Sequence, residues 1–187
     1  NLAGGNSATA DPADWVTRMS RCVLILDTSV LCCWFQVPDK DIAGPSDDRW
    51  DHNRIDARIQ QAMRDGSTLV LPLATLIETG NHIAQAKSLR FECGQKLAQC
   101  LRDAANAQTP WAAFTDQSAL WQSPNLVRLA DEWPSLAKSK LSIGDATIKD
   151  VAEYYARTGW SVEILTGDQG LKSYQPLQPA VVPRRRR

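Results

Sequence analysis

The sequence lacks the features that mark membrane, secreted or zinc-binding proteins. Its apolar runs all fall short of the roughly 18 residues that a membrane-spanning helix needs, and its first residues lack the charged-then-apolar order of a secretory signal peptide. The 5 cysteines include no C-x-x-C pair, and three of them lie in or beside apolar runs. We therefore expect no membrane span and no zinc site, and we expect reduced, mostly buried thiols in a cytoplasmic protein.

The chain also lacks a net charge, because 21 Lys and Arg balance 21 Asp and Glu. Its last four residues, 184–187, are all arginine, so the rest of the chain is mildly acidic. A hydrophobic share of 43% in 187 residues indicates one globular domain with a sizeable core. We expect this domain over 21–176, after a flexible leader or linker remnant at 1–20 and before a disordered, Pro- and Arg-rich tail at 177–187.

Short aliphatic runs alternate with helical patterns within 21–176. The runs VLILD (23–27), STLVLP (67–72) and SVEILT (161–166) are typical of strands buried on both faces of a parallel sheet. This alternation predicts an α/β fold, a three-layer α/β/α domain with a central parallel sheet.

The helical patterns between these runs have recognisable starts and ends. One helix is expected from Ser29, and a second is expected to be capped by Ser46 and to end at Gly66, with Ile55, Ile59, Ala62 and Met63 at helical spacing. Further helices are expected over 72–86, 90–106 and 142–159. The segment 106–138, which contains Trp111, Trp121 and Trp133, is either a short helix or an irregular insertion, and 167–174 is expected to be a loop.

Two of the expected strands end in the same way, at Asp27 and, through a Thr-Gly step, at Asp168. Parallel topology brings the carboxyl ends of strands to one edge of the sheet, where α/β proteins bind ligands. Each aspartate could equally cap the turn or helix that follows it.

Two further acids lie in expected helices. Glu78 lies two turns into the helix after the second strand, at the rim of its apolar stripe and beside Asn81. Asp145 opens the helix at 142–159, where Ser142 and an acid three residues later also resemble a capping box. Asp150 is an outside candidate on that same helix.

These four acids favour a metal site. Carboxylates that share one edge of a sheet repel one another unless a cation neutralises them. Oxygen ligands without His or Cys suit Mg²⁺ or Mn²⁺, which bind phosphates and stabilise both the attacking and the leaving oxygen of a phosphodiester. The predicted chemistry is hydrolysis of nucleic acid.

The segments LILDTSVL, LPLATLIETGNHI, IGDATIKDVAEYY and VEILTGDQGL resemble, in order, the four acidic motifs of PIN-domain nucleases over residues 22–172. The resemblance implies a metal-dependent endoribonuclease whose catalytic and metal-binding acids are Asp27, Glu78, Asp145 and Asp168. It implies 5′-phosphate and 3′-hydroxyl products. It assigns the hydroxyl after the first acid to Thr28 or Ser29, and it gives Thr166 the task of orienting the fourth acid or a phosphate.

The sequence offers several basic candidates for contact with RNA. Lys172, just past Asp168, is preferred, and Asn81 is a further candidate for substrate binding or support of the site. The other basic candidates are Arg49, Arg54, Arg58 and Lys149, whereas His82 is expected to be structural or solvent-facing. By analogy with toxin-type members, an inhibitory protein partner and a homodimer are hypotheses, although the 67-residue step from Glu78 to Asp145 departs from those members.

Two rival functions remain open. A phosphatase of the haloacid-dehalogenase type also places an aspartate after its first strand, but it needs a second aspartate two residues later, where this sequence has Ser29. A noncatalytic PIN-like module that binds RNA or scaffolds a complex is opposed only by the presence of all four acids.

Overall fold

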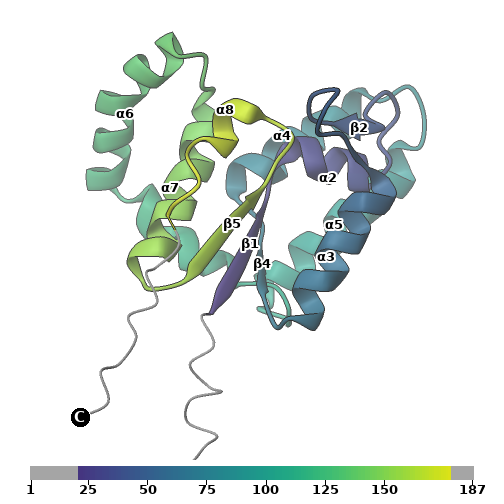
Figure 1. Cartoon of the computed structure of the whole chain (residues 1–187), viewed down its shortest axis with the longest axis horizontal. Helices are drawn as coiled ribbons and strands as arrows, with labels where there is room; N and C mark the ends of the chain where they lie inside the picture. The colour runs from purple at the N-terminus through teal and green to yellow at the C-terminus, as the bar shows by residue number, and fades with distance from the viewer. Residues whose placement is uncertain (1–20, 178–187) are drawn as a thin grey trace, which may run out of the picture.

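The computed structural model describes residues 21–177, which form a mixed α/β domain around a three-stranded parallel sheet (Figure 1). The central strand β1 (Cys22–Leu26) lies between β4 (Thr68–Val70) and β5 (Ser161–Leu165). In register, Ile25 faces Val70 on one side and Ile164 on the other. The three expected strands and the α/β class are thus confirmed. The expected leader and nearly all of the expected tail lie outside the described residues.

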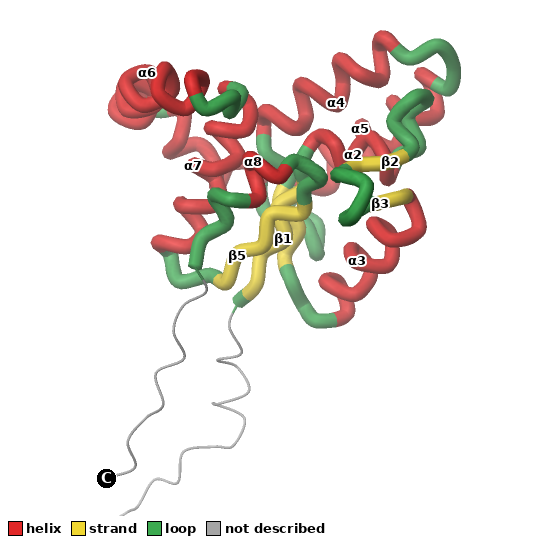
Figure 2. The backbone as a smooth tube through the Cα atoms, turned by 45° about the horizontal axis from the view of Figure 1, so that its top comes forward, coloured by secondary structure: helices red, strands yellow, loops and turns green. Residues whose placement is uncertain are grey.

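Helices cover both faces of the sheet because successive strand residues point to opposite sides (Figure 2). Leu24 and Leu26 pack against one group of helices, while Val23 and Ile25 pack chiefly against α7 (Ile143–Arg157). The first group comprises α2 (Thr28–Trp34), α3 (His52–Arg64), α4 (Leu73–Gln85) and α5 (Arg90–Ala105). Coverage of both faces explains why the strands are rich in aliphatic residues, and Glu163 of β5 is an exception that pairs with Arg58 of α3.

The start expected for the second helix is wrong. Strands β2 (Ile42–Ala43) and β3 (Trp50–Asp51) pair in antiparallel fashion, so the residues between them, including Ser46, form the connection instead of a helix. Helix α3 begins at His52, and the side chain of Asp51 caps it by accepting from the backbone N–H of Arg54. The pairing of β2 with β3 therefore overrides the helix start that Ser46 and the two aspartates after it suggested.

The sequence predicts an apolar stripe on α4 formed by Leu73, Leu76, Ile77, Gly80 and Ala84, but the observed buried face of this helix is different. It consists of Thr75, Thr79 and Ile83, whereas Ile77 is 54% exposed. The hydroxyl of Thr75 donates to the backbone oxygen of Leu26 at 2.9 Å. A threonine can line this face because its hydroxyl satisfies a strand-end carbonyl.

The segment expected to be a short helix or an insertion contains two helices, η1 (Phe114–Trp121) and α6 (Ser123–Lys138). Just before them, the backbone N–H of Leu69 donates to Pro110 O, and that of Ala112 donates to Leu69 O, both at 2.8 Å. These bonds cover the outer edge of β4. The exit of β5, expected to be a loop, contains the short helix α8 (Gln169–Lys172).

Four of the cysteines, Cys32, Cys33, Cys93 and Cys100, are buried and form no disulfide. This burial agrees with the expectation of mostly buried thiols. Within residues 21–177, no helix is long and apolar enough to cross a membrane.

Candidate functional site at the carboxyl ends of the strands

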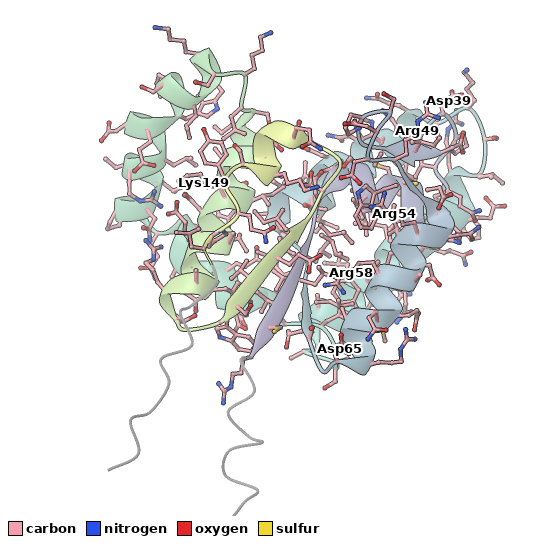
Figure 3. The ribbon with its side chains drawn as sticks, viewed as in Figure 1. Asp39, Arg49, Arg54, Arg58, Asp65 and Lys149 are labelled. Carbon is pink, nitrogen blue, oxygen red and sulfur yellow. The ribbon has the colours of Figure 1, made fainter. Side chains whose placement is uncertain are left out.

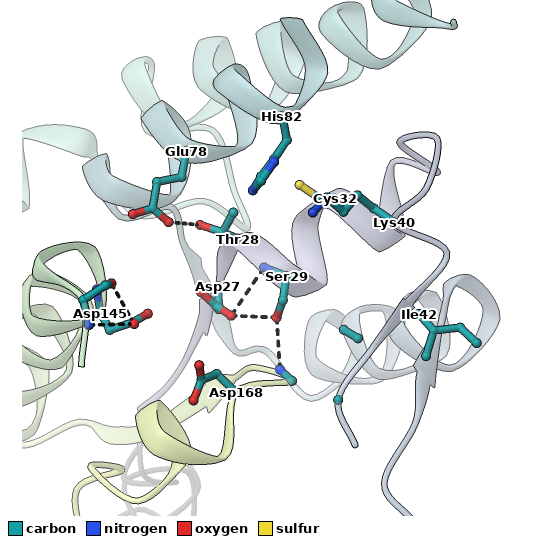
Figure 4. A pocket seen from close by; sticks show the side chains of 14 residues that line it. Asp27, Thr28, Ser29, Cys32, Lys40, Ile42, Glu78, His82, Asp145 and Asp168 are labelled. Carbon is teal, nitrogen blue, oxygen red and sulfur yellow. Dashed lines mark hydrogen bonds between the residues drawn. The ribbon is translucent and has the colours of Figure 1, made fainter. Parts of the chain in front are cut away.

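A cavity of about 400 Å³ opens at the carboxyl ends of the strands, and all four predicted acids line it. They come from four different places in the chain: the end of β1, the second turn of α4, the first turn of α7 and the exit of β5. Figure 4 shows their carboxylates around one common space. Tertiary structure therefore brings together Asp27, Glu78, Asp145 and Asp168, which span 141 positions of sequence between the first and the last.

Asp27 is the most buried of the four, with 4% of its surface exposed. Its Oδ2 accepts hydrogen bonds from Ser29 Oγ at 2.7 Å and from Thr166 Oγ1 at 2.8 Å, and its side chain caps α2. Burial raises the pKa of Asp27, the charge of Asp145 adds to this, and the two hydroxyl donors oppose it. Within the described residues, the hydrogen-bond donors that hold this carboxylate are neutral groups.

Glu78 is positioned by a hydroxyl and by a glycine. Thr28 Oγ1 donates to Glu78 Oε2 at 3.0 Å. On the other side, a Cβ added to Gly144 would lie 3.0 Å from Glu78 Cδ and closer still to Oε1. The start of α7 therefore packs directly against this carboxylate.

Asp168 is joined to Asp27 through shared hydroxyls. The backbone N–H of Asp168 donates to Thr166 Oγ1 at 2.9 Å, and that of Gly167 donates to Ser29 Oγ at 3.1 Å. The Asp168 carboxylate caps α8 through the N–H groups of Gly170 and Leu171. Ser29 and Thr166 thus tie the exit of β5 to the first acid.

Gly167 allows that exit to approach the β2 strand. A Cβ on Gly167 would lie 2.8 Å from Ala43 Cβ and even closer to the backbone nitrogen of Gly44. Ala43, Gly44 and Gly167 all line the cavity. A larger residue at 167 would therefore push the Asp168 loop away from the site.

Asp145 caps the start of α7 and also lines the cavity. It forms a capping box with Ser142, whose Oγ donates to Asp145 Oδ2 at 2.7 Å and accepts from the backbone N–H of Asp145 at 3.0 Å. The same aspartate lines the cavity and acts on the pKa of Asp27. Its carboxylate is used by the helix cap in the arrangement observed.

The four acids form no salt bridge with any residue in the described range 21–177. Within that range, however, no three side chains of His, Cys, Asp or Glu lie close enough to hold one metal ion as they stand. Each carboxylate is instead turned toward its own hydroxyl or amide donors. The site has the ligand type that Mg²⁺ and Mn²⁺ prefer, and binding such an ion would require some carboxylates to leave these donors.

Most of the predicted basic candidates are already paired. Lys172 Nζ lies 2.9 Å from Asp48 and does not line the cavity, and Arg54 contacts the same aspartate. Arg58 pairs with Glu163, and Lys149 with Glu153. Figure 3 shows Arg54 and Arg58 along α3 and Lys149 on α7. Asn81 is exposed and is not among the residues that line the cavity.

Asp150, the outside candidate, belongs to a separate contact. Its carboxylate pairs with both terminal nitrogens of Arg128, at 3.3 and 3.0 Å, and only 8% of its side chain is exposed. This pair links α6 to α7 away from the acidic pocket.

Two cavity residues were missed or undervalued in the sequence. Lys40 lies in the loop after α2, where no periodic pattern or motif distinguishes it from other surface lysines. His82, expected to be structural or solvent-facing, lines the cavity one helical turn beyond Glu78. Burial and the charge of Lys40 lower the pKa of His82, against the weaker effect of Glu78. His82 is therefore largely neutral at neutral pH.

Comparison with known proteins gives no match to a family model, to a curated protein or to a solved structure.

Proposed function

We propose that this chain is a Mg²⁺- or Mn²⁺-dependent endoribonuclease of the PIN-like class. The observation that carries the proposal is the convergence of four carboxylates, from four separate elements, on one cavity without any salt-bridge partner among residues 21–177. Such an unbalanced acidic cluster costs free energy unless a cation offsets it. The order of the four motifs and their strand-end and helix contexts support the same class.

Asp27, Glu78, Asp145 and Asp168 would hold the cation. When bound, it supplies Lewis-acid stabilisation of the phosphate and lowers the pKa of the attacking water. Ser29 and Thr166 fix the Asp27 carboxylate and, by donating to it, favour its ionised form. Thr28 orients Glu78 in the same way. Attack of water on phosphorus breaks the bond to the 3′ oxygen and leaves 5′-phosphate and 3′-hydroxyl ends.

A noncatalytic PIN-like module that binds RNA is the second candidate, and two observations favour it. Asp145 is engaged in its capping box, and the described acids are not close enough together to hold an ion without rearrangement. A protein of this kind would bind RNA and leave it intact. No observation supports the phosphatase alternative. That chemistry needs an aspartate at position 29, and this chain has a serine there, which donates to Asp27.

Cleavage of end-labelled single-stranded RNA and DNA tests the proposal. Wild-type protein is incubated with Mn²⁺, Mg²⁺ or EDTA beside the Asp27→Asn variant. We expect RNA cleavage with either metal, none with EDTA, and a loss of at least about 100-fold in the variant, equivalent to roughly 2.7 kcal/mol of transition-state stabilisation.

The control for folding is the thermal transition of each protein, measured in the same buffers. Metal-dependent cleavage that persists in Asp27→Asn would contradict the proposed site. Binding of RNA without cleavage would support the noncatalytic module instead. Hydrolysis of a small phosphomonoester, with both polymers left intact, would indicate the phosphatase.

A further inference from the structure

The acidic pocket has one positively charged end. Among the described residues, Lys40 is the one Lys or Arg that lines this pocket. It lies in the loop after α2, where its backbone N–H donates to Val37 O at 3.0 Å. In Figure 4 its side chain extends over Cys32 toward His82, on the far side of the pocket from Asp145 and Asp168.

The ammonium of Lys40 forms no salt bridge with any residue in the described range, although its neighbours are rich in acids. Asp39 beside it pairs with Lys87 at 3.0 Å. By contrast, the four basic residues discussed above as paired, Arg54, Arg58, Lys149 and Lys172, each contact an aspartate or a glutamate. Lys40 therefore combines two properties that those residues lack: access to the pocket and a charge available to a ligand.

The two side chains beside Lys40, Cys32 and His82, carry no positive charge that could also attract an anion. Burial raises the pKa of Cys32 to about 11, so this thiol is protonated at neutral pH. His82 is largely neutral for the reason given above. The positive charge at this end of the pocket thus comes from Lys40, while Asp145 and Asp168 lie on the far side (Figure 4).

We infer that Lys40 binds a backbone phosphate of RNA next to the phosphodiester that is cleaved. The inference rests on the proposed function, since it assigns the scissile group to the carboxylates and the neighbouring phosphate to the ammonium. Charge complementarity supports it: a polyanion that crosses an acidic pocket needs a cation beside the cluster, and each phosphate contact contributes to affinity without selecting sequence. Lys40 is accordingly a substrate-binding residue and takes no part in bond breaking.

The test compares the Lys40→Gln, Lys40→Arg and Lys172→Gln variants with wild-type protein. A matched control is Lys138→Gln, because Lys138 is an exposed lysine at the end of α6 that does not line the cavity. For each protein, kcat and KM for single-stranded RNA are measured with Mn²⁺ at several KCl concentrations. Direct binding of the same RNA is measured in parallel by fluorescence anisotropy.

We expect Lys40→Gln to raise KM about tenfold, equivalent to roughly 1.4 kcal/mol, with kcat within about twofold of wild type. The slope of log affinity against log salt should become shallower by about 0.7, the value for one phosphate contact on a single strand. Lys40→Arg should retain most of the affinity and the full slope. Lys138→Gln should match wild type in all three quantities.

Equal KM and equal salt slope in Lys40→Gln and wild type would overturn the inference, as would a larger loss in Lys172→Gln than in Lys40→Gln. A fall in kcat with unchanged KM would also overturn it. If the wild type cleaves nothing, the proposed function fails, and the anisotropy slope then decides the role of Lys40 by itself. The two failures are thus distinguishable.

Discussion

Gly144, at the start of α7, lies directly against the carboxylate of Glu78 on α4. Any side chain at 144 would occupy the space that Glu78 Oε1 now fills. Because Thr28 holds the other oxygen of that carboxylate, the glycine and the threonine together determine where Glu78 enters the cavity. The contact also fixes how closely α7, which carries Asp145, approaches α4.

Gly144→Ala should therefore displace Glu78 without unfolding the domain. The added methyl group meets the end of a flexible side chain, which can move away at small cost. We expect the cleavage rate to fall about tenfold, equivalent to roughly 1.4 kcal/mol, with a Tm within about 2 °C of wild type. Gly94→Ala is the matched control, because a Cβ on Gly94 in α5 meets no atom within 4 Å. Equal activity in both variants would show that the position of Glu78 does not matter.

Asp27→Asn should stabilise the protein when divalent cations are absent. Burial raises the pKa of this carboxyl, so its ionisation at neutral pH opposes folding. We expect a Tm about 2–4 °C higher than wild type in EDTA at neutral pH, the change that roughly 1 kcal/mol causes in a domain of this size. Addition of Mn²⁺ should stabilise the wild type more than the variant. A lower Tm for the variant in EDTA would contradict this account.

The raised pKa of Asp27 also predicts how the stability of the protein depends on pH. A carboxyl whose pKa is raised in the folded state binds its proton more tightly there than in the unfolded chain. Its contribution to stability is therefore greatest at acid pH and decreases as pH rises from the ordinary pKa through the raised one. The Tm advantage of Asp27→Asn over wild type in EDTA should be small at low pH and should grow across that interval. A constant difference at all pH values would assign the effect to another cause.

Ser142→Ala should separate helix capping by Asp145 from the cation binding proposed for it. Loss of the capping serine removes a hydrogen bond from the start of α7 and should cost about 1 kcal/mol of stability. The carboxylate no longer has to leave Ser142 Oγ to bind a cation, so we expect a lower Mn²⁺ concentration for half-maximal cleavage. An unchanged or higher Mn²⁺ requirement would indicate that Asp145 serves only as a helix cap.

Arg128→Met should destabilise the protein without changing the acidic pocket. The change leaves the Asp150 carboxylate, which is only 8% exposed, without its main partner. We expect a loss of about 2 kcal/mol in the free energy of unfolding, measured by urea denaturation, with kcat unchanged under conditions where the variant is folded. The double variant with Asp150→Asn should recover part of the loss. A fall in kcat for folded Arg128→Met would indicate that α6 contributes to the reaction.

The sequence predicted the strands and the capping box of α7 because both depend on neighbours in the chain. Continuous aliphatic runs such as VLIL are stable only where helices cover both faces of a sheet. Ser142 and Asp145 form their box within one turn of helix. Prediction failed at Ser46, where the pairing of β2 with β3 moved the helix start to His52.

The residues around the acids could not be ranked from the sequence. Lys172 was preferred because it follows Asp168, yet its ammonium contacts Asp48, more than a hundred positions earlier in the chain. Lys40 had no distinguishing pattern and lines the pocket. Which lysine remains available depends on ion pairs between distant segments, and no local pattern encodes those pairs.

By itself, the sequence determined that Asp27 and Asp168 follow strands, that Asp145 begins a helix and that Glu78 lies in the second turn of one, since local hydrophobic pattern and capping set those positions. Only the tertiary structure decided what each acid contacts. Thr166 donates to Asp27 across 139 positions of sequence, and Thr28 donates to Glu78 across 50. The physical reason is that hydrogen bonds and steric contacts act over a few ångströms. Only the packing of β5, α4 and α7 around β1 brings these groups within that range.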